Sequence, residues 1–366
     1  MLKPQPHILG LQPYVPGKSL RDASPELPIL KLASNENPLG PSPAAVAVIQ
    51  ALAGKAHIYP DDAATALKQA LADANGLTPG QIILGSGSDE VIAMVLHSFV
   101  GPGRPVVTAR ASFPMYAICA QSFGAEVQYL PLHQHRFDLS AYRQVPTGSV
   151  VCLADPNNPT GTTVAFDDLL SLVAARPDVL FLYDAAYEEY RERPATHTWG
   201  AIVAQHPNLF VSRTFSKAYA LAGLRIGYGY AHPELVDIVA RVRPPFNCNA
   251  LALAAAEQSL RDTDHLLRTR HTHQQSLTIL YDFFRTHDLE FVSSEANFVL
   301  VRLPPLAADT HETGGQAWAR RLLRHNVIVR ALPGIGYDEW IRVTTGTEEQ
   351  TLRFCSLLGT ELGGHS

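Results

Sequence analysis

Short runs of apolar residues, each followed by turn residues, recur through the first two thirds of the chain. Seven of them predict β-strands, at residues 82–84, 106–108, 127–130, 150–153, 179–183, 209–212 and 226–230. Several runs are apolar at consecutive positions rather than at alternate ones, which is typical of strands that are covered on both faces. We therefore expect these strands to form one buried and mostly parallel sheet.

Segments with a helical pattern lie between many of these runs. The clearest are residues 43–52, with Pro43 in the first turn, and residues 61–75, with acidic residues at the start and Gly76 after the end. Further helices are predicted at 88–100, 114–123 and 166–175. The alternation of strands and helices predicts a layered α/β domain with helices on both sides of the sheet.

The residue composition and the pattern of the sequence change after Pro244 and Pro245. Residues 250–287 are nearly free of proline and predict one or two long helices. The remainder predicts strands at 298–302, 327–330 and 341–343, and helices at 315–325 and 348–362. These elements indicate a smaller α+β domain at the C-terminal end.

The proline-rich residues 1–40 show little periodicity and predict an extended arm. We expect three parts along the chain: an arm at 1–44, a large domain at 45–245 and a C-terminal segment at 246–366. The large domain would be a continuous insertion, and the arm would join the C-terminal segment to form the small domain.

Composition narrows the class of protein. The chain has 366 residues, of which 46% are hydrophobic and 17% charged, so it can bury a sizeable core. Its net charge of −5 argues against nucleic acid as the main partner. No apolar stretch approaches the roughly 20 residues that a membrane span needs, and the N-terminus lacks the apolar centre of a secretory signal. We expect a cytoplasmic enzyme.

The spacing of the cysteines and histidines gives little support for a metal site or for disulfide bonds. The four cysteines are widely spaced and form no C-x-x-C pair. The pairs His133/His135 and His271/His273 lie in polar surroundings without cysteine or carboxylate partners at ligand spacing. We therefore expect no metal site.

Lys217 is the most informative candidate for catalysis. It follows the strand at 209–212, stands next to Ser216, and is eight residues before Arg225 in a turn flanked by glycines. A single lysine is most often a solvated surface residue. Here the hydroxyl and guanidinium groups beside it could bind a phosphate, and a partly desolvated lysine can form a Schiff base. A lysine beside a phosphate cup is what pyridoxal phosphate (PLP) requires.

Two further motifs follow apolar strands. Asp184 comes directly after the run at 179–183, with Tyr187 three residues later, and Asn158 stands in the Asp155–Gly161 turn. The carboxyl ends of strands are where open α/β sheets bind ligands. Asp184 could pair with the ring nitrogen of PLP, while Asn158 and Tyr187 could reach its phenolic oxygen. A helix cap, an Asn-Pro turn and a packing tyrosine are the plainer interpretations.

A glycine turn after the first strand predicts an anion site. Residues 84–90 read Leu-Gly-Ser-Gly-Ser-Asp-Glu and lead into a helix, whose first N–H groups and dipole attract a phosphate. Glu90 occupies the place of the third glycine of a dinucleotide fingerprint, and no Gly-Lys-Ser/Thr of a P-loop follows. One phosphate fits better than two. Phe113, after the next strand, could stack on an aromatic ring or could simply belong to the core.

Together these segments resemble the fold-type I PLP-dependent aminotransferases, and most closely the histidinol-phosphate aminotransferase family. The resemblance spans nearly the whole chain. Besides the motifs above it rests on residues 14–18, 34–40, 57–60, 243–247, 329–330 and 341–347. One departure is Ala185, where the family often has Glu, which leaves the subfamily open and the chemistry intact.

The resemblance implies a role for each matching residue. Lys217 would bind PLP as a Schiff base and then move the proton between the substrate and the cofactor. The other expected cofactor contacts are Ser88, Asp89, Phe113, Asn158, Asp184, Tyr187, Ser216, Arg225 and, from the partner subunit of a homodimer, Tyr59. Arg342 would bind the substrate carboxylate, and Arg330, Tyr14 and Asn37 would help to hold the phosphate or side chain.

The implied reaction is transamination of L-histidinol phosphate with 2-oxoglutarate in histidine biosynthesis, giving imidazole acetol phosphate and L-glutamate. Two alternatives share most of the motifs: an aromatic-amino-acid aminotransferase and a threonine-phosphate decarboxylase. A nucleotide-binding oxidoreductase would suit the sheet and the glycine turn but leaves Lys217 and Arg225 without a role. A non-catalytic regulator or binding protein built on the same fold would be favoured by an attached DNA-binding domain, for which we expect no spare length.

Overall fold

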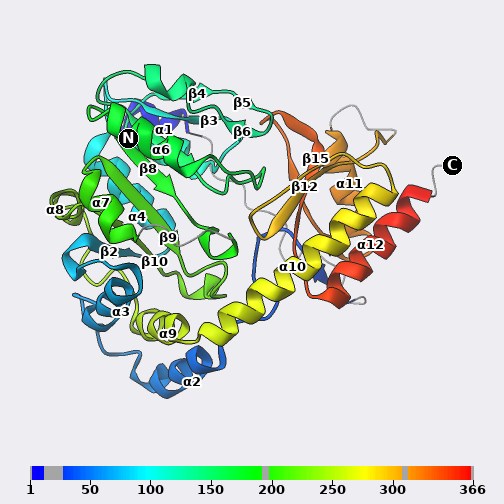
Figure 1. The fold of residues 1–366 in the computed structure, drawn as a ribbon, viewed down its shortest axis with the longest axis horizontal. Coiled ribbons are helices and arrows are strands. Elements are labelled where there is room, and N and C mark those ends of the chain that lie inside the picture. The colour runs from blue at the N-terminus through cyan, green and yellow to red at the C-terminus, as the bar shows by residue number, and fades with distance from the viewer. Residues whose placement is uncertain (1, 12–27, 192–197, 307–311, 364–366) are drawn as a thin grey trace.

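The computed structural model describes residues 2–11, 28–191, 198–306 and 312–363. Its main feature is a seven-stranded sheet in the order β2-β10-β9-β8-β7-β3-β4 (Figure 1). In chain order its strands are β2 (Ile82–Gly85), β3 (Val106–Ala109), β4 (Val127–Leu130), β7 (Val150–Ala154), β8 (Leu180–Asp184), β9 (Leu209–Thr214) and β10 (Gly227–Ala231). All seven predicted strands are therefore present, and they join in one sheet as expected.

Neighbouring strands from β4 to β9 pair in parallel, whereas β10 is antiparallel to both β9 and β2. No crossover helix lies between β9 and β10, so the chain returns beside β9 in the opposite direction. Every strand but β10 consequently ends at the same edge of the sheet. The residues that follow β2, β7, β8 and β9 are brought together there.

Helices cover both faces of this sheet. The helices α2 (Pro43–Leu52), α3 (Thr65–Asn75), α6 (Phe166–Ala175), α7 (Trp199–Gln205) and α9 (Ala250–Arg261) supply residues to one apolar cluster. The helices α4 (Ser88–Phe99), α5 (Met115–Ser122) and α8 (Pro233–Ala240) supply residues to another. Adjacent residues of β2 show why both clusters form: Ile83 belongs to the second, while Ile82 and Leu84 belong to the first. Burial on both faces explains the continuous apolar runs.

A smaller α+β unit contains an antiparallel sheet in the order β11-β12-β15-β14. Its strands are β11 (Phe291–Val292), β12 (Phe298–Arg302), β14 (Arg330–Leu332) and β15 (Tyr337–Thr344), and its helices are α10 (Thr263–Thr286), α11 (Gly314–Leu323) and α12 (Glu348–Gly363). A separate parallel pair joins β1 (Leu30–Lys31) to β13 (Val327–Ile328). Figure 1 shows α10 running between the two parts of the molecule.

The N-terminal strand packs with the C-terminal segment. Leu30 and Leu32 share an apolar cluster with Val299, Ile341 and Phe354. Within the described part of the predicted extended arm, residues Pro6–Leu9 form the short helix α1. The boundaries at residues 44 and 245 remain a prediction, and α9, which follows the second of them, packs with the large sheet through residues such as Ala252.

The remaining described elements are short: the strand pair β5 (Leu132–His133) and β6 (Arg136–Phe137), and five 3₁₀ turns. The helices α7 and α8, of seven and eight residues, and these shorter pieces were not predicted, because short segments carry little periodicity. Among the described residues, no helix combines the length and apolar character of a membrane span.

Candidate active site

Lys217 lies just beyond β9, at the edge of the sheet where the parallel strands end. Its ammonium nitrogen donates a hydrogen bond to the Ser34 carbonyl oxygen over 3.1 Å and lies 5.9 Å from the centre of the Tyr187 ring. Burial, reinforced by the positive charge of Arg342, lowers the pKa of Lys217 from 10.5 to about 8. A substantial fraction of this amine is therefore neutral, and nucleophilic, near physiological pH.

Asp184 is the last residue of β8 and is only 4% exposed. Its Oδ2 accepts a 2.6 Å hydrogen bond from the Tyr116 hydroxyl, and its Oδ1 is buried without a hydrogen-bond partner. Burial raises the pKa of Asp184 to about 6, although the Tyr116 hydrogen bond acts in the opposite direction. A buried carboxylate oxygen without a donor is costly, so this atom is suited to a cationic N–H group of a ligand.

Arg342, in β15, connects the two parts of the molecule. Its Nη1 donates to Asn158 Oδ1 over 2.5 Å and its Nη2 to the Ala33 carbonyl oxygen over 2.6 Å. Arg330 in β14 stands directly opposite Arg342 in the antiparallel pairing, so both side chains project from the same face. Like charges at opposed positions repel, and an anion between the two guanidinium groups would relieve that repulsion.

The Tyr187 hydroxyl is held by a residue from the N-terminal segment. Asn35 Nδ2 donates to Tyr187 Oη over 2.8 Å, and Asn35 Oδ1 accepts from the Thr344 hydroxyl over 3.0 Å. Asn35 is buried, and its backbone carbonyl accepts from Asn297 Nδ2. These contacts fix the Tyr187 ring from three distant segments of the chain.

The glycine turn and the turn after β9 form an anion cradle, which we define as Gly87, Ser88, Asp89, Ser216 and Arg225. Arg225 Nη2 donates to Asp89 Oδ2 over 3.1 Å, and Nη1 lies 3.5 Å from the Ser216 hydroxyl. Gly87 has φ +84°, and a Cβ on it would stand 2.3 Å from Arg225 Nη2. The backbone N–H groups at the start of α4 are thereby kept open beside a guanidinium, as a phosphate requires.

The other predicted residues are placed as follows. Phe113 is partly buried and packs edge-on against Tyr116, with ring centres 5.6 Å apart. Tyr59 is 77% exposed, and its ring centre lies 4.6 Å from that of Phe246. The side-chain amide of Asn37 donates hydrogen bonds to the Ala218 carbonyl oxygen and to the Thr269 hydroxyl. Tyr14 lies outside the described residues.

Two residues of the site were missed by sequence reasoning. Tyr116 lies three positions after Phe113 in α5, and nothing in its local sequence distinguishes it from a core tyrosine. Asn35 belongs to the 34–40 motif, but the substrate role was given to Asn37 two positions later. Both act through contacts that span more than 60 residues of sequence, which no local pattern reveals.

The arrangement fits a flat cofactor that carries one phosphate, a cationic ring nitrogen and a carbonyl. The cradle offers a single anion site, Asp184 Oδ1 an acceptor in need of a donor, and Lys217 an amine that attacks carbonyls. A family model described as aminotransferase class I and II matches residues 28–358. The chain belongs to this family.

Relatives of known sequence and structure agree with this assignment. Histidinol-phosphate aminotransferase 1 of Nitrosococcus oceani is 41% identical over 364 residues, covering 97% of this chain and 95% of the relative. The histidinol-phosphate aminotransferase of Moorella thermoacetica is 39% identical, covering 96% and 91%. The crystal structure of histidinol-phosphate aminotransferase from Sinorhizobium meliloti, in complex with pyridoxal-5'-phosphate, superposes with a TM-score of 0.89 at 27% identity. The superposition covers 100% of this chain and 99% of the other. The predicted family and fold class are confirmed.

Proposed function

We propose that the chain is a PLP-dependent aminotransferase that converts L-histidinol phosphate and 2-oxoglutarate to imidazole acetol phosphate and L-glutamate, a step of histidine biosynthesis. The observation that carries the proposal is the half-buried Lys217 amine, whose pKa is lowered to about 8, at the same sheet edge as the unpaired Asp184 Oδ1. The names of the relatives supply the substrate.

The residues that would hold PLP follow from the geometry. Asp184 would accept a hydrogen bond from the ring nitrogen, and Asn158 and Tyr187 would face the phenolic oxygen. Phe113 would stack on the ring. The phosphate would lie on the N–H groups of Ser88 and Asp89, with Ser216 and Arg225. When bound, PLP supplies a carbonyl that captures amines and a protonated ring that stabilises negative charge at the substrate Cα.

Lys217 would act twice. Its neutral Nζ would hold the cofactor through the cofactor's carbonyl group, and the free amine would later accept a proton from the substrate Cα and donate it again. A pKa of about 8 suits both directions, since the group gains and loses a proton near the working pH.

The guanidinium groups of Arg330 and Arg342, which stand at opposed positions of β14 and β15, would bind the anionic groups of both substrates. A carboxylate and a phosphate monoester each accept the two parallel hydrogen bonds of a guanidinium fork, so one pocket can serve histidinol phosphate and 2-oxoglutarate in turn. Tyr14 and Asn37 would help to hold the phosphate or the side chain. Charge alone does not exclude an aromatic amino acid here.

We also propose a homodimer with shared active sites. The support is the position of Tyr59, which projects from the surface beside Phe246 and is free to reach the cradle of a second copy. A cytoplasmic location remains the expectation from the sequence.

The decisive experiment is an absorption spectrum of the purified protein with PLP, before and after addition of histidinol phosphate. We expect a visible band that shifts on addition of this substrate. Lys217→Ala should remain folded by circular dichroism, lack that band and lose turnover, whereas Lys55→Ala, at an exposed position, should behave as the unchanged chain. Turnover by Lys217→Ala would refute the assignment.

Substrate choice needs a second measurement, because the alternatives share the cofactor. We expect kcat/KM for histidinol phosphate to exceed that for phenylalanine, and no release of carbon dioxide from threonine phosphate. A preference for phenylalanine or carbon dioxide release would favour the aromatic aminotransferase or the decarboxylase respectively.

A further inference from the structure

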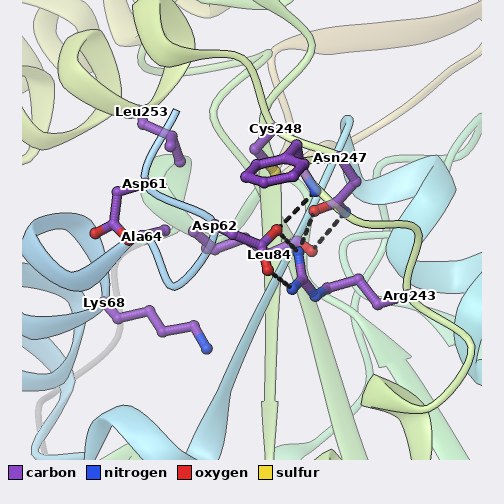
Figure 2. Close-up of a pocket in the computed structure, with 10 residues that line it drawn as sticks. Asp61, Asp62, Ala64, Lys68, Leu84, Arg243, Asn247, Cys248 and Leu253 are labelled. Atoms are coloured by element: carbon purple, nitrogen blue, oxygen red, sulfur yellow. Dashed lines mark hydrogen bonds and ion pairs between the residues drawn. The ribbon is translucent and has the colours of Figure 1, made fainter. Parts of the chain in front are cut away.

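Four polar side chains, Asp62, Arg243, Asn247 and Glu90, form a continuous set of hydrogen bonds next to the anion cradle, and we call them the polar bridge. The first three of them line a small pocket (Figure 2). The bridge joins three segments that are distant in sequence: the turn before α3, the loop after α8 and the first turn of α4.

At one end, the polar bridge fixes an exposed aromatic pair. Asp62 accepts two hydrogen bonds from Arg243, over 3.0 and 2.7 Å, and a third from the Phe246 backbone N–H over 2.6 Å. Phe246 has φ +52°, a conformation that a phenylalanine adopts only when its surroundings enforce it. The Phe246 ring in turn contacts Tyr59. These donors hold the pKa of Asp62 at about 2, so the carboxylate is ionised at neutral pH.

At the other end, the polar bridge fixes the glycine turn. Arg243 Nη1 donates to Asn247 Oδ1 over 2.9 Å, and Asn247 Nδ2 donates to Glu90 Oε2 over 2.6 Å and to the Leu84 carbonyl oxygen over 3.1 Å. Glu90 Oε2 also accepts from the Ser86 backbone N–H over 2.6 Å. Ser86 directly precedes Gly87 and Ser88 of the cradle, so Glu90 determines how that turn enters α4.

We propose that the polar bridge positions the cradle turn and the Tyr59–Phe246 pair relative to one another, and that Asp62 and Glu90 thereby set the affinity for the cofactor phosphate without touching it. This inference rests on the proposed function. Its physical basis is that a phosphate site made of backbone N–H groups works only when those groups are held in place before the ligand arrives. Asp62 and Glu90 are positioning residues.

The test compares two ligands of the protein freed of cofactor: PLP and pyridoxal, which lacks the phosphate. Affinities are obtained by titration of the visible band. We expect Asp62→Ala and Glu90→Gln each to weaken PLP binding about tenfold, the effect of one charged hydrogen bond, and to change pyridoxal binding by less than about twofold. The double variant should lose little more than either single variant, because both break the same bridge.

Asp237→Asn is the matched control, since it removes a carboxylate from an Asp–Arg pair on the exposed face of α8. It should leave both affinities unchanged. If Asp62→Ala fails to fold, Asp62→Asn can replace it, because it keeps the shape of the side chain and one acceptor while removing the charge. We then expect a smaller loss of PLP affinity, again without a matching loss of pyridoxal affinity.

If the variants lost affinity for PLP and pyridoxal equally, the polar bridge would be only a general stabilising contact and the inference would be wrong. Unchanged PLP affinity in the Asp62 and Glu90 variants would also overturn it. Failure of the unchanged protein to bind PLP would instead overturn the proposed function, and the inference with it.

Discussion

At the scale of single residues, surroundings decide the chemistry of the site. Lys217 and Asp184 are ordinary residue types, yet burial shifts their pKa values in opposite directions, to about 8 and about 6. Each shift disfavours the charged form of its group. Burial deprives both groups of contact with water. The proposed ligand would replace that contact, because it offers a carbonyl to the Lys217 amine and a cationic N–H group to the Asp184 carboxylate.

The lowered pKa of Lys217 predicts a pH dependence. The neutral amine predominates above pH 8 and is lost as the pH falls below it; at pH 7 about one tenth is neutral, against roughly one part in 3,000 for a lysine at 10.5. The rate at which the cofactor-free protein captures pyridoxal should therefore rise with pH to a midpoint near 8. Stopped-flow absorbance measures it, and a midpoint near that of a free lysine would contradict the environment described for Lys217.

At the scale of elements, the close approach of β10 to the start of α4 shapes the cradle. A Cβ on Gly227, the first residue of β10, would lie 2.3 Å from the Ser88 nitrogen, and one on Gly87 would lie 2.3 Å from Arg225 Nη2. Backbone is packed against backbone and guanidinium with no room for a side chain. The antiparallel insertion of β10 between β2 and β9 therefore brings Arg225 to the helix N-terminus.

Gly87→Ala tests this packing. The added methyl group must displace Arg225, so we expect PLP affinity to fall by about tenfold or more. Gly103→Ala is a matched control, because Gly103 has a similar φ of +79° but nothing within 4 Å of the added Cβ. It should cost about 1 kcal/mol of unfolding free energy and leave the affinity unchanged. Equal PLP affinities in the two variants would show that Arg225 does not need this close contact.

At the scale of the whole molecule, the site is assembled from segments that lie far apart in the chain. Asn35 reaches Tyr187, and Arg342 joins Asn158 to Ala33. The N-terminal segment, through Asn35, and β15, through Arg342, thus contact residues that follow β8 and β7 of the large sheet. A second copy would add Tyr59, which its own chain leaves exposed.

Subunit mixing tests whether Tyr59 serves the partner's site. Lys217→Ala and Tyr59→Ala are each expected to be impaired as homodimers. A mixed dimer would contain one site with both residues intact, so random exchange should restore about a quarter of the unchanged specific activity. If Tyr59 serves its own chain, mixing would produce no intact site, and activity would stay at the average of the two variants.

The amino-acid sequence by itself determined the seven strands of the main sheet, most of the long helices, and the family. Continuous apolar runs identify strands buried on both faces, and motifs that follow them place chemistry at a sheet edge. Those signals are local and weak in short helices: α5, of eight residues, was predicted, whereas α7 and α8, of seven and eight residues, were not.

Only the tertiary structure decided which groups meet. The antiparallel direction of β10, the Tyr116 hydrogen bond to Asp184, the Asn35 contact with Tyr187 and the polar bridge around Asp62 all join residues more than ten positions apart. Burial, and with it the reactivity of Lys217, also depends on the folded surroundings. Contacts between distant segments produce no periodic pattern in the sequence, so the residues that meet can be identified only in the folded structure.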